Sequence, residues 1–139
     1  SASRDAVANP THENIKARLN VVIHDQEAIS DELIAVRQAV YSREGFAESM
    51  KAIAALQNPQ IRERNSVQDD DYQEQTLPAL LVWTDHEPSG DPEEGRRLAG
   101  LMERGQFVLI ENAAHWPQWE DPERFNSEVL KFLKEVDQS

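Results

Sequence analysis

The sequence predicts an α/β fold in which a helical N-terminal region precedes a strand–helix–strand–loop–helix unit. Two short continuous apolar runs, ALLVW (79–83) and QFVLI (106–110), are bounded by turn residues, as is typical of strands buried on both faces of a parallel sheet. The stretch between them has the capping residues and the apolar periodicity of a helix. Since parallel strands need a crossover connection of this kind, we assign residues 71–139 to an α/β unit.

Helical periodicity dominates the first half of the chain, where apolar residues recur three or four positions apart. The first stretch has Ile15, Leu19, Val22 and Ile23; the second has Ile29, Leu33, Val36 and Val40; the third has Met50, Ile53 and Ala54. Ser30 is the expected N-cap of the second helix, and the third should end before Pro59.

A polar and acidic stretch, RERNSVQDDDYQEQ (62–75), has little periodicity and follows these helices. Such a charge run is typical of a solvated connection between parts of a protein. We therefore expect a helical region over residues 1–66 and an α/β region over residues 67–139.

Capping residues define the helices of the second half. Asp91 followed by Pro92 predicts a helix start, with Glu94 completing a capping box, and Gly105 predicts its end. Asp121 followed by another proline predicts the start of a last amphipathic helix. Its apolar face comprises Phe125, Val129, Phe132, Leu133 and Val136.

Two parallel strands do not make a viable sheet by themselves. Strands patterned for burial on both faces need neighbours on their edges and helices above and below. The α/β region therefore reads as the end of a larger sheet, and we expect the chain to associate with a complementary segment or with copies of itself.

Composition excludes several classes of function. The formal net charge of −12 opposes binding to nucleic acids and to anionic membranes, and no stretch is long and apolar enough for a membrane span. The chain has no cysteine, which excludes disulfides and thiolate chemistry. We expect a cytoplasmic protein.

Ionisable side chains follow both predicted strands. Asp85, His86 and Glu87 come after the first strand, and His115 comes after the second. Because parallel strands end at the same edge of a sheet, an acid of the first loop should reach the His115 imidazole and fix its tautomer. Three consecutive residues cannot all point at one ion, so no metal site is predicted.

The remaining histidines and the tryptophans receive simpler interpretations. His12 and His24 are interpreted as helix-surface residues, and Trp83 and Trp119 as packing residues. Trp116 lies beside His115 on a loop and is the candidate for a pocket wall.

The segment LPALLVWTDHEP…EEGRRLA…FVLIENAAHWPQWEDPERFN resembles the C-terminal part of the α/β-hydrolases, and within them the carbon–carbon bond hydrolases that cleave meta-ring-fission products. The upstream PTHENIKARLNVVIHD…DELIAVRQAVYSREGF resembles the helical lid of the same family. The resemblance covers residues 9 to 136. It implies an α/β-hydrolase fold represented by its lid (1–66) and its last strands and helices (67–139), incomplete alone.

The resemblance assigns roles residue by residue. His115 matches the triad histidine, and Glu87 matches the triad acid because it stands four residues after the strand-end tryptophan; Asp85 is the alternative acid. Trp116 matches a tryptophan that lines the substrate site. Arg37 matches a lid arginine that faces the substrate carboxylate, with an exposed helix arginine as the alternative interpretation. No metal and no organic cofactor are implied.

The sequence departs from the family pattern in several places. Thr84 and Ala114 stand where glycines are usual, and Glu87 stands in place of aspartate. No G-x-S-x-G motif occurs, and neither Ser1 nor Ser3 has a strand-to-helix elbow around it. The serine nucleophile and the oxyanion hole would therefore lie on a missing segment or on a second chain.

These features give one principal hypothesis and two alternatives. The principal hypothesis is the lid and C-terminal portion of a serine-triad hydrolase that acts on dienoates in aromatic degradation, inactive as an isolated chain. An esterase of the same fold is one alternative, because the same triad serves both acyl transfers. A non-catalytic protein that binds a ligand or self-associates is the other.

Overall fold

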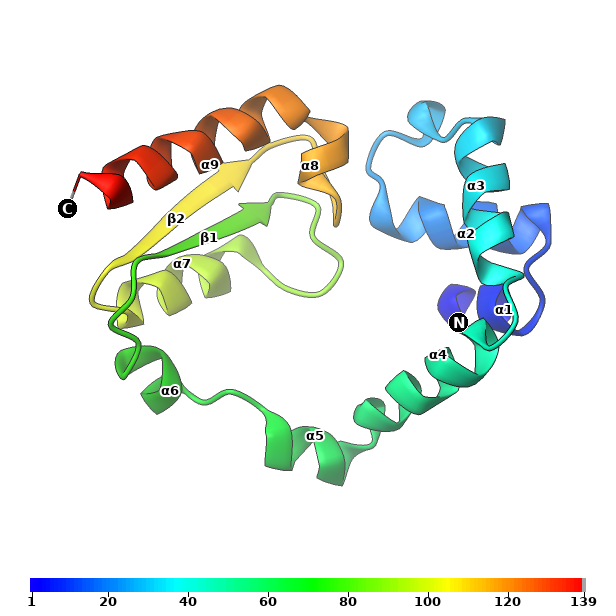
Figure 1. Cartoon of the computed structure of the whole chain (residues 1–139), viewed down its shortest axis with the longest axis horizontal. Helices are drawn as coiled ribbons and strands as arrows, with labels where there is room; N and C mark the ends of the chain where they lie inside the picture. The colour runs from blue at the N-terminus through cyan, green and yellow to red at the C-terminus, as the bar shows by residue number, and fades with distance from the viewer. Residues whose placement is uncertain (139) are drawn as a thin grey trace. The chain divides into compact units, whose positions relative to one another are not determined.

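The structure is a computed structural model that describes residues 1–138 (Figure 1). The chain divides into two compact units. One contains Ser1–Val21 and Gln26–Ser66, and the other contains Val22–Asp25 together with the chain from Val67 onward. The short segment Val22–Asp25 therefore belongs to the second unit, although its neighbours on both sides belong to the first.

Within its described residues, all the regular secondary structure of the first unit is helical. Its helices are α1 (Ala2–Ala8), α2 (His12–Val22, whose last residue belongs to the second unit), η1 (Gln26–Ala28), α3 (Asp31–Tyr41), α4 (Phe46–Ala54), η2 (Ala55–Gln57) and α5 (Pro59–Asn65). The expected apolar face of α2 is confirmed, since Ile15 and Leu19 are both 1% exposed. The buried face of α3 is narrower than expected, because Val36 lies 56% exposed.

The expected N-caps are confirmed by their hydrogen bonds. Ser30 Oγ accepts from the Leu33 amide at 3.1 Å, Asp91 Oδ1 from the Glu93 amide at 2.8 Å, and Asp121 Oδ1 from the Arg124 amide at 3.0 Å. Each satisfies an amide that the first turn of a helix leaves without a partner. The cap residues therefore set where these helices begin.

The capping box expected for Glu94 is wrong. Its carboxylate instead pairs with Arg97 on the next turn, at 2.8 Å to both Nε and Nη2. The same guanidinium donates two further bonds to Asp69, at 2.8 and 3.0 Å. A planar fork satisfied by two carboxylates outcompetes the reach back to the helix start.

The polar stretch expected to be an irregular connection contains helical turns. Part of α5 and all of α6 (Asp69–Gln73) fall within residues 62–75. Local hydrogen bonds explain both, since Asn58 Oδ1 accepts from the Gln60 amide at 3.0 Å and Asp71 Oδ2 from the Gln68 amide at 2.7 Å. Such short helices leave no periodic apolar face to predict them from.

The second unit is built on two parallel strands, β1 (Ala79–Thr84) and β2 (Gly105–Ile110), as expected. They pair in register from Ala79 opposite Gly105 to Thr84 opposite Ile110. Helix α7 (Pro92–Leu101) connects them, α8 (Pro117–Glu120) follows β2, and α9 (Pro122–Asp137) ends the described chain. Helices α7 and α9 lie on opposite sides of the strand pair (Figure 1).

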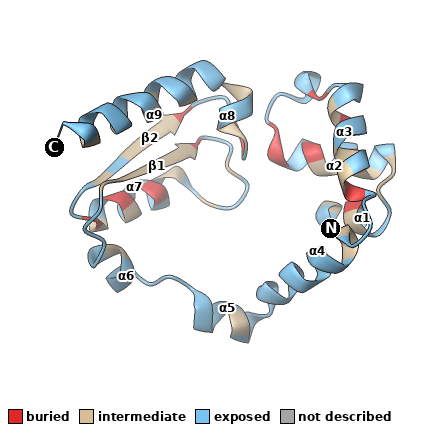
Figure 2. Cartoon of the chain, in the orientation of Figure 1, coloured by how far each residue is buried: buried red, intermediate tan, exposed pale blue. Residues whose placement is uncertain are grey.

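Most strand residues are half-buried rather than buried. Only the last residue of each strand, Thr84 and Ile110, is buried, at 1% exposure. Figure 2 shows both strands in the colour of intermediate burial along most of their length. Two strands give each other a single shared edge, so the outer edges and part of the faces stay open. Full burial, as the apolar runs predict, would need further strands beside them.

No helix among residues 1–138 combines the length and the apolarity that crossing a bilayer requires.

Candidate active site

The site forms where the two strands end. Because Thr84 and Ile110 are the last register pair, the loops that follow them leave from the same edge of the strand pair. The two loops are joined directly, since the His86 amide donates to the Ala113 carbonyl at 3.1 Å. Side chains of either loop are thereby brought within contact distance of the other.

Glu87 and His115 meet across these loops. Nδ1 of His115 lies 2.9 and 3.0 Å from the two carboxylate oxygens of Glu87. A carboxylate only accepts, so this contact places the imidazole proton on Nδ1 and leaves Nε2 as the acceptor of the neutral ring. The Glu87 side chain is 13% exposed and that of His115 is 48% exposed, so the acid is sheltered while the ring reaches solvent.

Ser89 also donates hydrogen bonds to Glu87. Its amide and its hydroxyl both donate to Glu87 Oε1, at 3.0 and 2.6 Å. Burial raises the pKa of the Glu87 carboxyl, but the hydrogen bonds from Ser89 and His115 outweigh this effect and hold the pKa below its ordinary value. Glu87 is therefore an anion at neutral pH, able to stabilise a positive charge on the imidazole.

Asp85 does not contact His115. Its two carboxylate oxygens accept from the backbone amides of Asn112 and Ala113, at 3.0 and 3.3 Å. Asn112 has a positive φ of 58°, which is the turn that aims these amides at Asp85. Asp85 thus fixes the loop that carries the histidine, whereas Glu87 contacts the histidine itself.

The three ionisable side chains after β1 make different contacts. Asp85 accepts from the backbone of the histidine loop, and Glu87 contacts His115. The His86 ring stacks on the ring of His24 with centroids 3.7 Å apart and planes 12° apart, and its Nε2 lies 3.7 Å from Asp85 Oδ2. His24 follows the end of α2 and so does not lie on a helix surface, which corrects the expectation made for it. His12, in contrast, is exposed on the first turn of α2, where its Nε2 lies 3.3 Å from Asp31.

The three tryptophans lie in different surroundings. Trp83 packs under α7, beside Gly95, and its indole N–H donates to the Gly90 carbonyl at 3.2 Å. Trp116 is half-buried at the N-terminus of α8, directly after His115. Trp119 is 40% exposed, so it packs less completely than expected.

Arg37 belongs to the other unit of the chain. It is half-buried on α3, and its guanidinium carbon lies 5.3 Å from the centroid of the Tyr41 ring, one turn along the same helix. This cation–π contact holds the side chain along its own helix.

Three positions around the histidine were not predicted from the sequence. Ser89 could have been found, since a hydroxyl two residues after an acid is a common local hydrogen-bond donor. Thr84 donates from its buried hydroxyl to the Ala114 carbonyl at 2.6 Å, and Glu120 accepts from the Ala114 amide at 2.8 Å. The Thr84 bond joins positions 30 residues apart, which a local pattern does not reveal.

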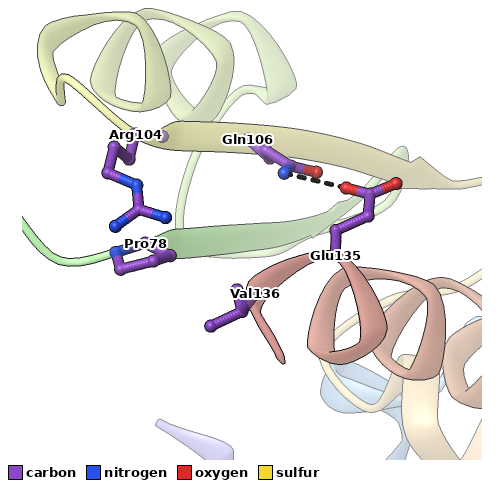
Figure 3. Close-up of a pocket in the computed structure, with 6 residues that line it drawn as sticks. Pro78, Arg104, Gln106, Glu135 and Val136 are labelled. Carbon is purple, nitrogen blue, oxygen red and sulfur yellow. Dashed lines mark hydrogen bonds between the residues drawn. The ribbon is translucent and has the colours of Figure 1, made fainter. Parts of the chain in front are cut away.

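A hollow lies at the opposite end of the strands, where they begin. It has a volume of about 180 Å³ and is lined by Pro78, Arg104, Gly105, Gln106, Glu135 and Val136. Gln106 Nε2 donates to Glu135 across it at 3.2 Å (Figure 3). Ligands of open parallel sheets bind at the carboxyl ends of the strands, so this hollow is separate from the candidate active site.

Comparison with known proteins places the chain in a family. A model of the α/β hydrolase fold matches residues 14–122. The 2-hydroxy-6-oxononadienedioate/2-hydroxy-6-oxononatrienedioate hydrolase of Burkholderia vietnamiensis is 32% identical over 132 residues, which are 91% of this chain and 43% of that protein. The protein of the same name from Paraburkholderia phymatum is 31% identical over 131 residues, covering 90% of this chain and 42% of that protein.

Solved structures agree with this result. A meta-cleavage product hydrolase from Pseudomonas fluorescens IP01 superposes with a TM-score of 0.79 at 25% identity, covering 90% of this chain and 46% of that chain. A 2-hydroxy-6-oxo-6-phenylhexa-2,4-dienoate hydrolase from a Rhodococcus species superposes with a TM-score of 0.71 at 14% identity, which shows the fold alone. The chain thus spans less than half the length of these relatives. With residues 14–122 matched to the family model, which is most of its length, the chain belongs to the α/β hydrolase fold family.

Proposed function

We propose that this chain supplies the acid and the histidine of a serine-type catalytic triad in a carbon–carbon bond hydrolase. The observation that carries the proposal is the bond between the Glu87 carboxylate and Nδ1 of His115. A carboxylate on Nδ1 leaves Nε2 free to accept a proton, which is what a histidine base requires. The nucleophilic serine would come from outside these 139 residues, because the sequence has no G-x-S-x-G motif.

In this proposal His115 transfers protons and Glu87 makes the transfer easier. Nε2 takes the proton from the incoming serine hydroxyl or from water, and the imidazolium returns it to the leaving group. The Glu87 carboxylate stabilises that imidazolium, and its lowered pKa keeps it ionised across neutral pH. Asp85 takes no part in the transfer, since its oxygens are engaged by Asn112 and Ala113.

The proposed substrates are dienoates of the kind that the relatives are named for, which are vinylogous 1,5-diketone acids. The similarity to the two 2-hydroxy-6-oxononadienedioate hydrolases supports this class. Trp116 would form an apolar wall beside the base, and Arg37 would bind a substrate carboxylate through its planar fork. Esters are the alternative substrates, because the same triad cleaves them.

A chimaera tests the proposal. The segment of the Burkholderia vietnamiensis hydrolase that aligns with this chain would be replaced by this chain, so that the relative supplies the rest of the fold. We expect the chimaera to hydrolyse 2-hydroxy-6-oxononadienedioate, and the loss of dienoate absorbance measures this reaction. His115→Ala should reduce kcat by about a thousandfold or more, and Glu87→Gln by a comparable factor.

Asp85→Asn tests the alternative acid, because it neutralises a carboxylate two residues from Glu87 that holds the loop of His115 without touching the ring. Its kcat should stay within about tenfold of the parent, far above that of Glu87→Gln. A chimaera that turns over equally well after His115→Ala contradicts the proposal. Activity confined to p-nitrophenyl esters would favour the esterase alternative.

A further inference from the structure

Three adjacent backbone groups beside His115 are held from three different parts of the chain. The Ala114 amide donates to Glu120 Oε2 at 2.8 Å, and the Ala114 carbonyl accepts from Thr84 Oγ1 at 2.6 Å. The His115 amide donates to the Val22 carbonyl at 2.9 Å. With these peptide groups fixed, the direction in which the His115 side chain leaves the backbone is fixed as well.

Glu120 makes a second contact that extends this arrangement. Its other oxygen, Oε1, accepts from the His24 amide at 2.5 Å. Val22 and His24 both belong to the segment Val22–Asp25, so one carboxylate joins that segment to the loop of the histidine. The sequence separation between His24 and Glu120 is 96 residues.

The two contacts of Glu120 differ in their exposure to water. Ala114 is 4% exposed and Glu120 is half-buried, whereas His24 is exposed. The bond from the Ala114 amide is therefore the more sheltered of the two, and its loss leaves a buried donor unsatisfied.

An ordinary structural role at the end of α8 does not account for these contacts. Helix α8 has four residues, and the Glu120 amide already closes its turn by donating to the Trp116 carbonyl at 2.9 Å. The side chain then turns back past His115 to a residue six positions earlier in the sequence. Both of its oxygens are used for backbone amides outside the helix.

We propose that Glu120 is a positioning residue for the histidine base. By accepting from Ala114 and His24 at once, its carboxylate holds the loop against the segment Val22–Asp25, which in turn holds the His115 amide. This arrangement keeps the ring where Glu87 meets Nδ1. The inference rests on the proposed role of His115, but the geometry of the ring can be tested without any substrate.

The test compares Glu120→Gln with the wild-type chain by NMR. Glutamine has the same shape, but one of its two terminal atoms is an NH2 donor, so in the wild-type side-chain position one of the two amides loses its acceptor. We expect exchange of the Ala114 or His24 amide with solvent to become about tenfold faster, and the ring nitrogen signals of His115 to shift toward a mixture of tautomers. The amides of β1, β2 and α7 should keep their wild-type exchange rates.

Glu123→Gln is the matched control, since it removes an exposed carboxylate three residues away, on the first turn of α9. It should leave both readouts unchanged. Wild-type His115 ring signals in Glu120→Gln would overturn the proposal, and so would a uniform rise in exchange across both strands, which would indicate general loss of stability. Glu120→Asp gives a second variant should the glutamine fail to fold, because its shorter side chain also cannot span both amides.

The chimaera adds a kinetic readout. A misplaced base lowers the rate of the chemical step more than it weakens substrate binding, so Glu120→Gln should reduce kcat about 10- to 100-fold with KM changed less than about threefold. An unchanged kcat would overturn the positioning role. If the unmutated chimaera is inactive, the proposed function fails, while the ring signals still decide whether Glu120 positions His115.

Discussion

Two carboxylates leave the end of β1 only two residues apart, yet they serve different groups. Asp85 holds the backbone at Asn112 and Ala113, and Glu87 holds the His115 ring. Partial burial raises the pKa of the Asp85 carboxyl. The hydrogen bonds from the two backbone amides and the nearby His86 ring lower this pKa by more, so that it lies below its ordinary value of 3.8. The folded state therefore favours the ionised form of Asp85.

This preference predicts how Asp85→Asn affects stability. A carboxyl whose pKa is lowered on folding contributes stability above its unfolded pKa and loses it as the pH falls through the folded value. We expect Asp85→Asn to lower the free energy of unfolding by about 1–2 kcal/mol at neutral pH. The difference from the wild type should shrink as the pH is lowered toward about 3.

Urea unfolding at a series of pH values measures this effect. Asp70→Asn, a change at an exposed position on α6, is the control and should alter stability little at any pH. A difference between Asp85→Asn and wild type that grows toward acid pH would show that the Asp85 carboxylate does not stabilise the fold.

For single residues, the sequence predicts which residue types come together at the candidate active site, but it does not predict which of them form hydrogen bonds with one another. The placement of His115 and an acid after two parallel strands follows from strand order. The choice between Asp85 and Glu87 does not, because it depends on the turn at Asn112, whose positive φ directs two amides toward the nearer acid. Glu120 and the Val22 carbonyl are beyond any local pattern, since they act across long sequence separations.

Helix α7 shows how an element is fitted to the strands. Gly95 is buried where the helix crosses them, and a Cβ at this position would lie 2.5 Å from Cε3 of Trp83 and 3.0 Å from Cε2 of Phe107. The aromatic rings occupy the space that any side chain would need. Close packing against these rings therefore requires a glycine at position 95.

Alanine substitutions at the two glycines of α7, Gly95 and Gly100, should consequently have opposite effects on stability. Gly95→Ala should destabilise the chain by about 1–3 kcal/mol, because the helix must move away from Trp83. Gly100→Ala, in the same helix with nothing within 4 Å of the added Cβ, should stabilise it by about 0.5–1 kcal/mol. Thermal unfolding of the two variants beside the wild type gives both values, and equal signs would contradict this packing.

The elements themselves follow largely from local signals. Ser30, Asp91 and Asp121 mark helix starts because their side chains bond to amides two or three residues ahead. The box expected at Glu94 failed because Arg97 engages the Glu94 carboxylate, and the same guanidinium is held by Asp69, 28 residues away in the sequence. Local rules predict an element best when its charged residues have no distant partner.

The whole molecule carries open strand edges and apolar surface. Leu130 and Leu133 on α9 are 55% and 49% exposed, and the strands are half-buried. Exposed apolar side chains and unpaired strand edges both favour association. The formal net charge of −12 opposes it, most strongly at low salt.

We therefore expect the isolated chain to self-associate, and to do so more strongly as salt is added. Sedimentation velocity at several protein and salt concentrations measures this, with Leu130→Glu and Leu133→Glu together expected to shift the chain toward monomer. A well-folded monomer at every concentration would count against the need for further strands.

The segment Val22–Asp25 determines how the chain can be divided. A cut between Ser66 and Val67 separates the two units along the sequence, but it leaves this segment on the wrong fragment. The fragment with both strands would keep Glu120 and His115 while losing the Val22 carbonyl and the His24 amide that they bind. Because those contacts are made by backbone groups, a short peptide covering the segment offers the same atoms when added separately. Expression of the strand-containing part alone has to restore this segment, either as such a peptide or as a fused N-terminal extension.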